Sequence, residues 1–414
     1  MLTSTTALLN HNTPIFDWYL MPEAYSAPLV NEAIHEFDVK QGETVLDPFC
    51  GTGTTLLAAR LAGRNAIGVE VNPFLCFASR IKNRDSYDLP RLKLELKSVV
   101  AAAHLRIDRG CDDLSTQAMP TMPDMPRIER WIARKVACKI VVLRQCIEEL
   151  TSEQNRDIPM LALSSILRGA SNMKLSPHAF GSREVKHDAP VLAMFELKLQ
   201  KMLTDIEWLQ EQQRNRKLGH ASVVQGDIRS VSGLQHPLLP AHLAIGSPPY
   251  LNNLDYTMQT RMELFFLGFI NSMDELKNLR KRMMICDAKA TYRDIEDWQR
   301  VAEVASVAKI ARDIDDKLGD KGWGWDYGRM TRQYFGGLLR AMEAIKPMLS
   351  PGASLVFILG ESAHAGILVP VPDLAAELGL LAGYTNPEVR PLRTRRSSSH
   401  TFGLKESAVV LRNG

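Results

Sequence analysis

The sequence has no long hydrophobic run and no N-terminal targeting pattern. A membrane-spanning helix needs about 20 apolar residues in a row, and the most apolar stretches, Phe265–Ile270 and Leu355–Leu359, are far shorter and typical of a buried core. The N-terminus has no basic segment leading into an apolar one, so we expect no signal peptide. These absences predict a cytoplasmic protein that does not associate with membranes.

Cysteine is scarce and spaced without pattern. The six cysteines include no Cys-x-x-Cys pair and no Cys/His cluster with the spacing of a zinc site. We therefore expect free thiols in a reducing compartment and no bound metal.

Neither sign of charge predominates overall, because the net charge is only +3. Its distribution is uneven: residues 75–222 carry 24 Lys/Arg against 18 Asp/Glu, a net charge of +6. Four arginines cluster near the C-terminus, at Arg390, Arg393, Arg395 and Arg396. Basic stretches of this kind contact phosphates in nucleic-acid-binding proteins, although a solvated surface accounts for them equally well.

Residues 43–84 alternate between strand and helix patterns. An apolar strand at 43–46 precedes a helix at 54–62, and a second strand at 65–70 precedes a helix that begins at Pro73. This βαβ unit predicts an α/β fold with a mostly parallel sheet. Helical periodicity then replaces the alternation, and strands resume near residue 222. We therefore predict a sheet domain assembled from residues 1–84, 220–257 and 335–414, with helical insertions at 85–219 and 258–334.

A glycine turn, Asp47–Thr55 (DPFCGTGTT), follows the first predicted strand. Gly51 and Gly53 stand between a strand and a helix, where nucleotide-binding turns occur. Leu56 replaces the third glycine of a dinucleotide fingerprint, and no Gly-Lys-Ser/Thr of a phosphate-binding loop follows. The turn therefore favours a cofactor that has a ribose and no phosphate, S-adenosylmethionine.

Three acidic residues are candidates for holding that cofactor. Glu70 ends the second strand, where a carboxylate can accept hydrogen bonds from both ribose hydroxyls. Asp47 is a candidate for the ammonium group. Asp227, after the predicted strand Ser222–Gln225, is a candidate for the adenine amino group, although its position also fits a helix N-cap.

The segment Ser247–Tyr250 (SPPY) follows a further predicted strand and offers acceptors in a rigid arrangement. Ser247 supplies a hydroxyl oxygen and Pro248 a backbone carbonyl, while Pro248 and Pro249 fix the backbone and remove its N–H donors. Acceptors around an exocyclic base amine favour a tetrahedral, nucleophilic nitrogen, which is a form of electrostatic preorganisation. Tyr250 offers a stacking face, and a duplex base must flip out to reach it. Cys50 lies in the glycine turn, which argues against a cysteine that attacks the base ring.

These motifs resemble those of the amino-methyltransferase family of DNA methyltransferases, which methylate cytosine N4 or adenine N6. Asp47–Thr55 is similar to the family's first motif, Gly68–Glu70 to the second, Gly226–Ile228 to the third, Ser247–Tyr250 to the catalytic fourth, and Trp18–Val30 to the segment beside the cofactor's methionine end. The SPPYLNNLDYT and LGESAHAG stretches also resemble a subgroup of site-specific DNA methyltransferases.

The resemblance implies a class I, Rossmann-like methyltransferase sheet with two helical insertions. It assigns Asp47, Pro48, Phe49, Gly51, Gly53, Glu70, Asp227 and Ile228 to S-adenosylmethionine, and Ser247, Pro248, Pro249 and Tyr250 to the target base. It implies double-stranded DNA as the substrate, with a restriction or defence system as a partner that the sequence does not specify. The SPPY form is associated mostly with cytosine N4, so adenine N6 is the second choice.

The insertions offer further candidates. Residues 171–182, flanked by Arg168, Lys174, Arg183 and Lys186, are a candidate DNA-contacting loop for target recognition, and Trp323, Trp325 and Tyr327 are candidates for stacking on a base. Arg393, Arg395 and Arg396 are candidates for phosphates near that base, and 395–399 is a predicted loop. Two alternatives to DNA methylation remain: an RNA base-amine methyltransferase, and a DNA-binding subunit with a vestigial cofactor fold.

Overall fold

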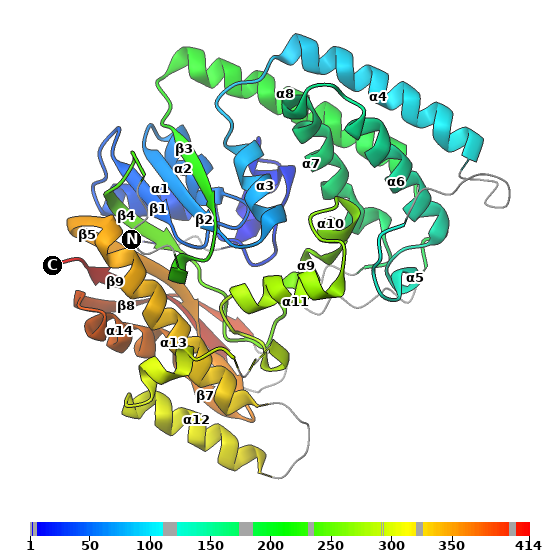
Figure 1. The fold of residues 1–414 in the computed structure, drawn as a ribbon. Helices are drawn as coiled ribbons and strands as arrows, with labels where there is room; N and C mark the ends of the chain where they lie inside the picture. Colours follow the sequence, from blue (N-terminus) through cyan, green and yellow to red (C-terminus); the bar gives the residue numbers. More distant parts are fainter. Residues whose placement is uncertain are drawn as a thin grey trace.

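The computed structural model describes residues 2, 6–110, 122–173, 185–230, 236–290, 292, 294–319, 326–396 and 403–414. Within them a seven-stranded sheet forms in the order β3-β2-β1-β4-β5-β9-β8 (Figure 1). Its strands are β1 (Thr44–Asp47), β2 (Asn65–Glu70), β3 (Ala221–Gln225), β4 (Ala241–Gly246), β5 (Leu349–Gly360), β8 (Thr385–Arg396) and β9 (Gly403–Arg412). The first five strands in that set are parallel, whereas β9 pairs antiparallel with β5 and β8 antiparallel with β9. The predicted Rossmann-like, mostly parallel sheet is confirmed.

Helices cover both faces of the sheet, as alternating buried residues require. Val45 belongs to one apolar core and Leu46 to the other, and Val356 and Phe357 divide in the same way. The first core includes α1 (Ala27–Glu36), α2 (Thr54–Leu61) and α3 (Pro73–Lys82), and the second includes α13 (Tyr327–Ile345) and α14 (Val371–Leu381). Both faces are therefore buried.

The strand order reverses beside β1. β1 pairs with β2 on one side and with β4 on the other, so the next two strands, β2 and β3, extend the sheet on one side of β1, and β4 and β5 extend it on the other. Ligands in open α/β sheets bind beyond the carboxyl ends of the strands at such a switch point. The carboxyl end of β1 is Asp47, the first residue of the glycine turn.

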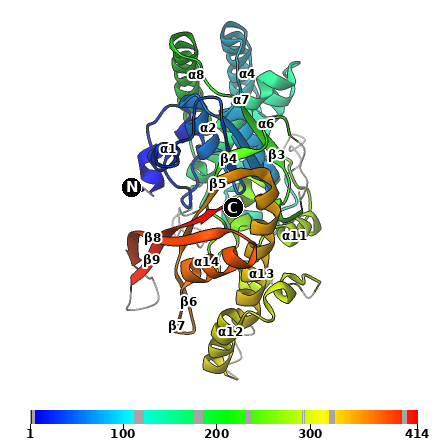
Figure 2. The same ribbon diagram turned by 90° about the vertical axis from the view of Figure 1, so that its left-hand side faces the viewer.

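In the sequence, a bundle of helices follows α3 and precedes β3. It consists of α4 (Leu89–Gly110), α5 (Ile128–Trp131), α6 (Arg134–Glu148), α7 (Glu153–Ala170) and α8 (Val191–Asn215). In Figure 2, α4 and α8 project from one end of the molecule and α12 (Ala305–Leu318) from the other. Many of the bundle's basic side chains form ion pairs within it, such as Lys93 with Glu207 at 2.6 Å and Arg106 with Glu149 at 2.7 Å. Pairing of this kind reduces the positive charge that the bundle presents to solvent.

A second helical region follows β4. It contains α9 (Tyr256–Gln259), α10 (Arg261–Phe266), α11 (Met273–Arg282), the short 3-10 helices η4 (Ala288–Ala290) and η5 (Asp297–Val301), and α12. α13 runs without a break across residue 334, where the sequence predicted the insertion to end. The hairpin of β6 (Ser362–His364) and β7 (Ile367–Val369) was not predicted at all.

Candidate active site

Segments that follow four parallel strands line a single cavity, which we call the strand-end cavity. It contains about 1020 Å³ of empty space, its open mouth included, which is ample for a nucleoside-sized ligand. The predicted site residues that line it are Asp47, Pro48, Phe49, Gly51, Glu70, Asp227, Ile228, Ser247, Pro248, Pro249 and Tyr250. Further parts of the wall come from the N-terminal segment, between Met21 and Tyr25, and from the end of α11, at Arg282 to Met284.

Gly53 is the one predicted site residue that does not line the cavity. Its φ of +78° is left-handed, and an added Cβ would stand 2.3 Å from Ser79 Oγ on α3. Gly51, by contrast, lines the cavity with a φ of +50° and has no atom within 4 Å of where its Cβ would stand. Gly53 therefore serves the packing of the turn, and Gly51 leaves the backbone open to the cavity.

Glu70 is held at the end of β2 by two backbone amides. Its Oε2 accepts from Gly51 N at 2.9 Å and its Oε1 from Asn72 N at 2.8 Å. Burial raises the pKa of Glu70 to about 7, and the two hydrogen bonds oppose that rise. The carboxylate is thus fixed in orientation, and it keeps further acceptor sites on the cavity wall.

Asp47 is more fully occupied by its own neighbours. Its Oδ2 accepts from Tyr25 Oη at 2.8 Å and from Thr55 Oγ1 at 2.6 Å, and its Oδ1 accepts from Phe49 N at 3.0 Å. Burial raises the pKa of Asp47 to about 6. Asp47 therefore ties the N-terminal segment, the glycine turn and α2 together at the cavity.

The N-terminal segment is also anchored to α8 of the helical bundle and to α3. Ile15 N and Trp18 Nε1 donate to Asp205 Oδ2 of α8, at 2.9 and 2.8 Å. The buried Lys82 ammonium donates to Phe16 O at 3.0 Å, and burial lowers the pKa of Lys82 to about 7. The segment that was predicted to lie beside the cofactor is therefore fixed against both α3 and α8.

Asp227 lies just beyond β3, and its carboxylate is held by Arg229 of η3 (Ile228–Ser230). Arg229 Nη2 donates to Asp227 Oδ2 at 2.9 Å, and the backbone N–H of Arg229 donates to Asp227 Oδ1 at 3.0 Å. The second bond is a cap of the short helix, so the alternative role foreseen for Asp227 is present as well. Sequence reasoning missed Arg229, although it directly follows the third motif.

The SPPY segment follows β4 and is fixed mainly through Tyr250. The Tyr250 backbone N–H donates to Tyr256 Oη at 3.1 Å, and the Tyr250 hydroxyl donates to Glu406 Oε1 at 3.2 Å. Burial, followed by the charge of Glu406, raises the pKa of Tyr250, which keeps the phenol neutral. The next residue is also held, because the Nε2 of His364 lies 3.0 Å from Leu251 O.

The predicted arginine cluster is mostly engaged within the protein. Arg393 pairs with Glu406 at 2.7 Å, and Arg390 pairs with Glu388 at 2.7 Å. The guanidinium of Arg395 lies 5.0 Å from the centroid of the Tyr250 ring. Arg395 and Arg396 belong to β8 rather than to a loop, which corrects that prediction, while 397–399 lie outside the described residues.

The remaining candidates of the insertions fall into two groups: some lie outside the described residues, and the others have partners within the protein. Trp323, Trp325, Lys174 and Arg183 lie outside the described residues, as does most of 171–182. Tyr327 stacks on His364 at 5.1 Å, and its hydroxyl accepts from Asn253 Nδ2 at 3.3 Å. Arg168 donates to Gln259 O at 2.7 Å and Lys186 to Gly169 O. Each of these three side chains therefore has a partner within the protein.

The cysteines of the described segments are all buried. Burial, followed by the charges of Glu70 and Asp47, raises the pKa of the Cys50 thiol well above its usual value, so the nucleophilic thiolate is disfavoured. Across the described residues, no group of three or more His, Cys, Asp or Glu side chains is arranged to hold a metal ion. None of the helices described combines the length and apolar character of a membrane span.

Comparison with known proteins agrees with the motifs. A family model described as DNA methylase (N6_N4_Mtase) matches residues 18–80. The Type II methyltransferase M.BsoBI of Geobacillus stearothermophilus is 24% identical over 97% of this chain and 85% of its own length. M.AvaI of Anabaena variabilis is 24% identical over 94% and 83%. A tRNA (guanine(10)-N2)-dimethyltransferase of Methanocaldococcus jannaschii is 32% identical, but over only 22% of this chain and 25% of its own length. Together these matches support the amino-methyltransferase family of DNA methyltransferases that the motifs indicated.

Proposed function

We propose that this protein transfers a methyl group from S-adenosylmethionine to an exocyclic amine of a base in double-stranded DNA, with cytosine N4 as the preferred target. The observation that carries the proposal is the strand-end cavity, which is lined by the glycine turn, by Glu70, by Asp227 and by the SPPY segment. These segments are far apart in sequence and meet where open α/β sheets bind ligands.

The cavity fits the cofactor by size and by chemistry. Glu70 presents a fixed carboxylate to the two ribose hydroxyls, and Gly51 lets the ligand approach the backbone closely. Asp227 accepts from the adenine amino group, and Asp47 places negative charge on the side of the ammonium group. Pro48, Phe49 and Ile228 supply apolar walls. When it is bound, S-adenosylmethionine supplies an electrophilic methyl carbon on a positively charged sulfur.

The SPPY segment prepares the nucleophile. Ser247 Oγ and the Pro248 carbonyl accept from the two amine N–H bonds, which raises electron density on the nitrogen. A bond forms between the amine nitrogen and the methyl carbon while the bond from that carbon to sulfur breaks, and its electron pair stays on sulfur. The nitrogen then loses one proton to solvent. Tyr250 holds the plane of the base so that the nitrogen points at the methyl carbon.

The choice of substrate rests on the similar proteins and on the SPPY segment. M.BsoBI and M.AvaI, which match nearly the whole chain, are named as Type II methyltransferases, whereas the tRNA methyltransferase matches about a fifth of it. This difference favours site-specific methylation of DNA over RNA. We extend the proposal to target recognition by the first helical region, residues 85–219. Ser247 at the head of the motif favours cytosine N4 over adenine N6.

A labelling experiment tests the proposal. The purified protein is incubated with methyl-labelled S-adenosylmethionine and mixed-sequence duplex DNA, with unlabelled RNA as competitor. We expect label in DNA that excess RNA does not suppress, and none with the Ser247→Ala/Tyr250→Ala double variant. Label that RNA competes away favours the RNA alternative, and a protein that binds no cofactor favours the vestigial subunit.

A further inference from the structure

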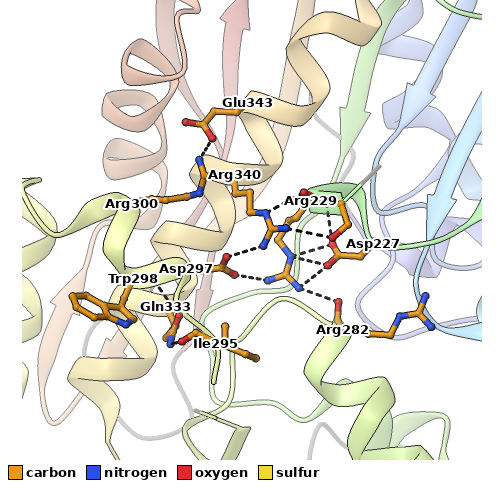
Figure 3. A network of polar contacts seen from close by, with 11 residues as sticks. Asp227, Arg229, Arg282, Ile295, Asp297, Trp298, Arg300, Gln333, Arg340 and Glu343 are labelled. Carbon is orange, nitrogen blue, oxygen red and sulfur yellow. Dashed lines mark hydrogen bonds and ion pairs between the residues drawn. The ribbon is translucent and has the colours of Figure 1, made fainter. Parts of the chain in front are cut away.

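A row of four charged side chains leads from the strand-end cavity into the second helical region (Figure 3). The row runs from Asp227 to Arg229, then to Asp297 of η5, and ends at Arg340 of α13. Its two central members are almost fully buried, because the Arg229 side chain is 4% exposed and the Asp297 side chain 5%. Buried charges are costly unless they are paired and hydrogen-bonded, so an arrangement like this constrains the positions of its members strongly.

At the cavity end, Arg229 fixes the orientation of the Asp227 carboxylate. Arg229 Nε donates to Oδ1 at 3.0 Å and lies 3.1 Å from Oδ2, while Nη2 donates to Oδ2 at 2.9 Å. With the backbone N–H of Arg229, three donors meet one carboxylate. A carboxylate has about four acceptor sites, so Asp227 keeps capacity for one more donor on the cavity side.

At the other end, Asp297 fixes Arg229. Asp297 Oδ2 accepts from Arg229 Nη1 at 2.6 Å, and Oδ1 accepts from Arg340 Nη1 at 3.2 Å. Arg340 Nε also donates to the Arg229 backbone carbonyl at 3.0 Å. Negative and positive groups alternate along the row. Neutralising Asp297 therefore leaves two guanidinium groups facing each other and removes one of the anionic partners that hold Arg229 in position.

Two glycines of α13 make room for this arrangement. An added Cβ at Gly336 would stand 1.8 Å from Asp297 O, and one at Gly337 would stand 3.3 Å from Asp297 Oδ2. The backbone of η5 thus lies directly against α13, and the ion pairs sit where these two elements meet η3.

Arg229 also contacts a second segment of the cavity wall. Its Nη2 donates to the Arg282 backbone carbonyl at 2.9 Å, and Arg282 lines the strand-end cavity at the end of α11. A single guanidinium therefore connects the segment after β3, the end of α11 and η5. Figure 3 shows the Arg282 carbonyl turned toward Arg229 while the Arg282 side chain extends away from it.

We propose that Arg229 and Asp297 are positioning residues that aim the Asp227 carboxylate at the amino group of the cofactor's adenine. Recognition of the cofactor's adenine then depends on the second helical region, which supplies Asp297. The inference rests on the proposed function, because it assumes that S-adenosylmethionine occupies the strand-end cavity. Neither residue touches the reacting atoms, so their effect is on recognition of the cofactor and not on the transfer step.

The test compares two ligands that differ only in whether the base carries its amino group. Calorimetry measures the dissociation constants of S-adenosylhomocysteine and of its 6-deamino analogue, in which a purine with hydrogen at C6 replaces the adenine. A hydrogen bond to a charged acceptor is worth about 10- to 100-fold in affinity, so we expect the wild type to prefer the amino compound by about that factor. We expect Asp297→Asn and Arg229→Lys to reduce the preference to about threefold or less. A purely structural role would weaken both ligands equally and leave the preference unchanged.

Arg300→Gln provides the matched control. Arg300 of η5 pairs with Glu343 of α13, so this variant removes an ion pair between the same two elements but outside the row (Figure 3). It should keep the wild-type preference. If Asp297→Asn does not fold, Arg229→Lys carries the test, because lysine keeps the charge and loses the forked geometry.

The outcomes separate this inference from the proposed function. A wild type that binds neither ligand contradicts the proposed function itself. A wild type that binds both ligands equally, or variants that keep the full wild-type preference, overturn the positioning role and leave the methyltransferase proposal intact.

Discussion

The guanidinium of Arg395 covers one face of the Tyr250 ring, with its central carbon 5.0 Å from the ring centroid. Gly360 permits this contact, because an added Cβ there would stand 2.0 Å from Arg395 Nη2 and 3.2 Å from Tyr250 Cε2. The Tyr250 hydroxyl is held in turn by Glu406. The ring is therefore fixed on one face and at its edge, so a base that stacks on Tyr250, as proposed, would use the other face.

Replacing Tyr250 separates stacking from the hydroxyl contact. Stacking of a base on an aromatic side chain is worth roughly 1–3 kcal/mol, so we expect Tyr250→Ala to lower turnover by about 100-fold. Tyr250→Phe keeps the ring and loses the hydroxyl contacts with Glu406 and Ser247, and it should stay within about threefold of the wild type. Steady-state rates at saturating cofactor measure both. Full activity of the alanine variant would show that the base does not stack on Tyr250.

Ser247→Ala tests the acceptor role of the SPPY segment. Removing one of two preorganised acceptors costs roughly 3 kcal/mol at comparable sites, so we expect the rate of transfer to fall by about 100-fold or more. Binding of S-adenosylhomocysteine should change by less than about twofold, because the hydroxyl acts on the target amine. Single-turnover rates and calorimetry distinguish the two effects. Weaker cofactor binding at an unchanged rate would place Ser247 in the cofactor site instead.

Gly51→Ala and Gly53→Ala form a matched pair in the same turn. Both residues have left-handed φ angles, so each alanine costs about 1 kcal/mol of backbone strain. At Gly53 the new methyl group also collides with Ser79, and we expect the larger loss of thermal stability there. At Gly51 it meets no protein atom but stands at the wall of the cavity, so the larger loss of cofactor affinity is expected. Equal effects of both variants on stability and on affinity contradict this division.

Glu70 makes folding stability depend on pH in a defined direction. Its pKa rises from an ordinary value of 4.5 to about 7 on folding, so the folded state holds a proton that the unfolded state has lost between these values. Stability from this group is therefore fully present below about pH 4.5 and is lost as the pH rises to about 7. The loss is on the order of 3 kcal/mol, at 1.36 kcal/mol per pKa unit.

Urea unfolding of the wild type and of Glu70→Gln, at pH 5 and at pH 8, measures this contribution. The difference in unfolding free energy between the two proteins should shift in favour of the glutamine variant by a few kcal/mol at the higher pH. S-adenosylhomocysteine should bind the variant at least about tenfold more weakly at pH 8, where the wild-type Glu70 is ionised and one acceptor for the ribose is lost. The difference should be smaller at pH 5, where the wild-type carboxyl is itself protonated. The same pH dependence in both proteins contradicts the assignment to Glu70.

The sequence predicted the parallel half of the sheet better than its antiparallel edge. β1 and β2 were found because their apolar residues are continuous and end in chemically distinctive side chains, Asp47 and Glu70. β8 was missed because it carries alternating charged residues and two prolines, Pro387 and Pro391. An edge strand tolerates both, since one side of its backbone is unpaired.

In the candidate site, too, the sequence predicted some residues and missed others. Its predicted residues directly follow strands, so local pattern was enough to find them. Arg229 is held by Asp297, 68 residues away, and by Arg340, and nothing in a single sequence signals that these three meet. The cover that Arg395 forms over Tyr250 depends equally on the register of β8 against β9. Contacts of this kind arise from tertiary packing, which periodicity and motifs do not report.

The most direct test of the account is the identity of the methylated base. Duplex DNA is incubated with the protein and S-adenosylmethionine whose methyl group carries deuterium, then digested to nucleosides and analysed by mass spectrometry. We expect deuterated N4-methylcytosine that disappears in the Ser247→Ala/Tyr250→Ala variant, and N6-methyladenine in its place would retain the amine chemistry but correct the base. A methyl group on a ring carbon, or none on any base while the cofactor binds, would contradict the central claim that this site methylates an exocyclic amine.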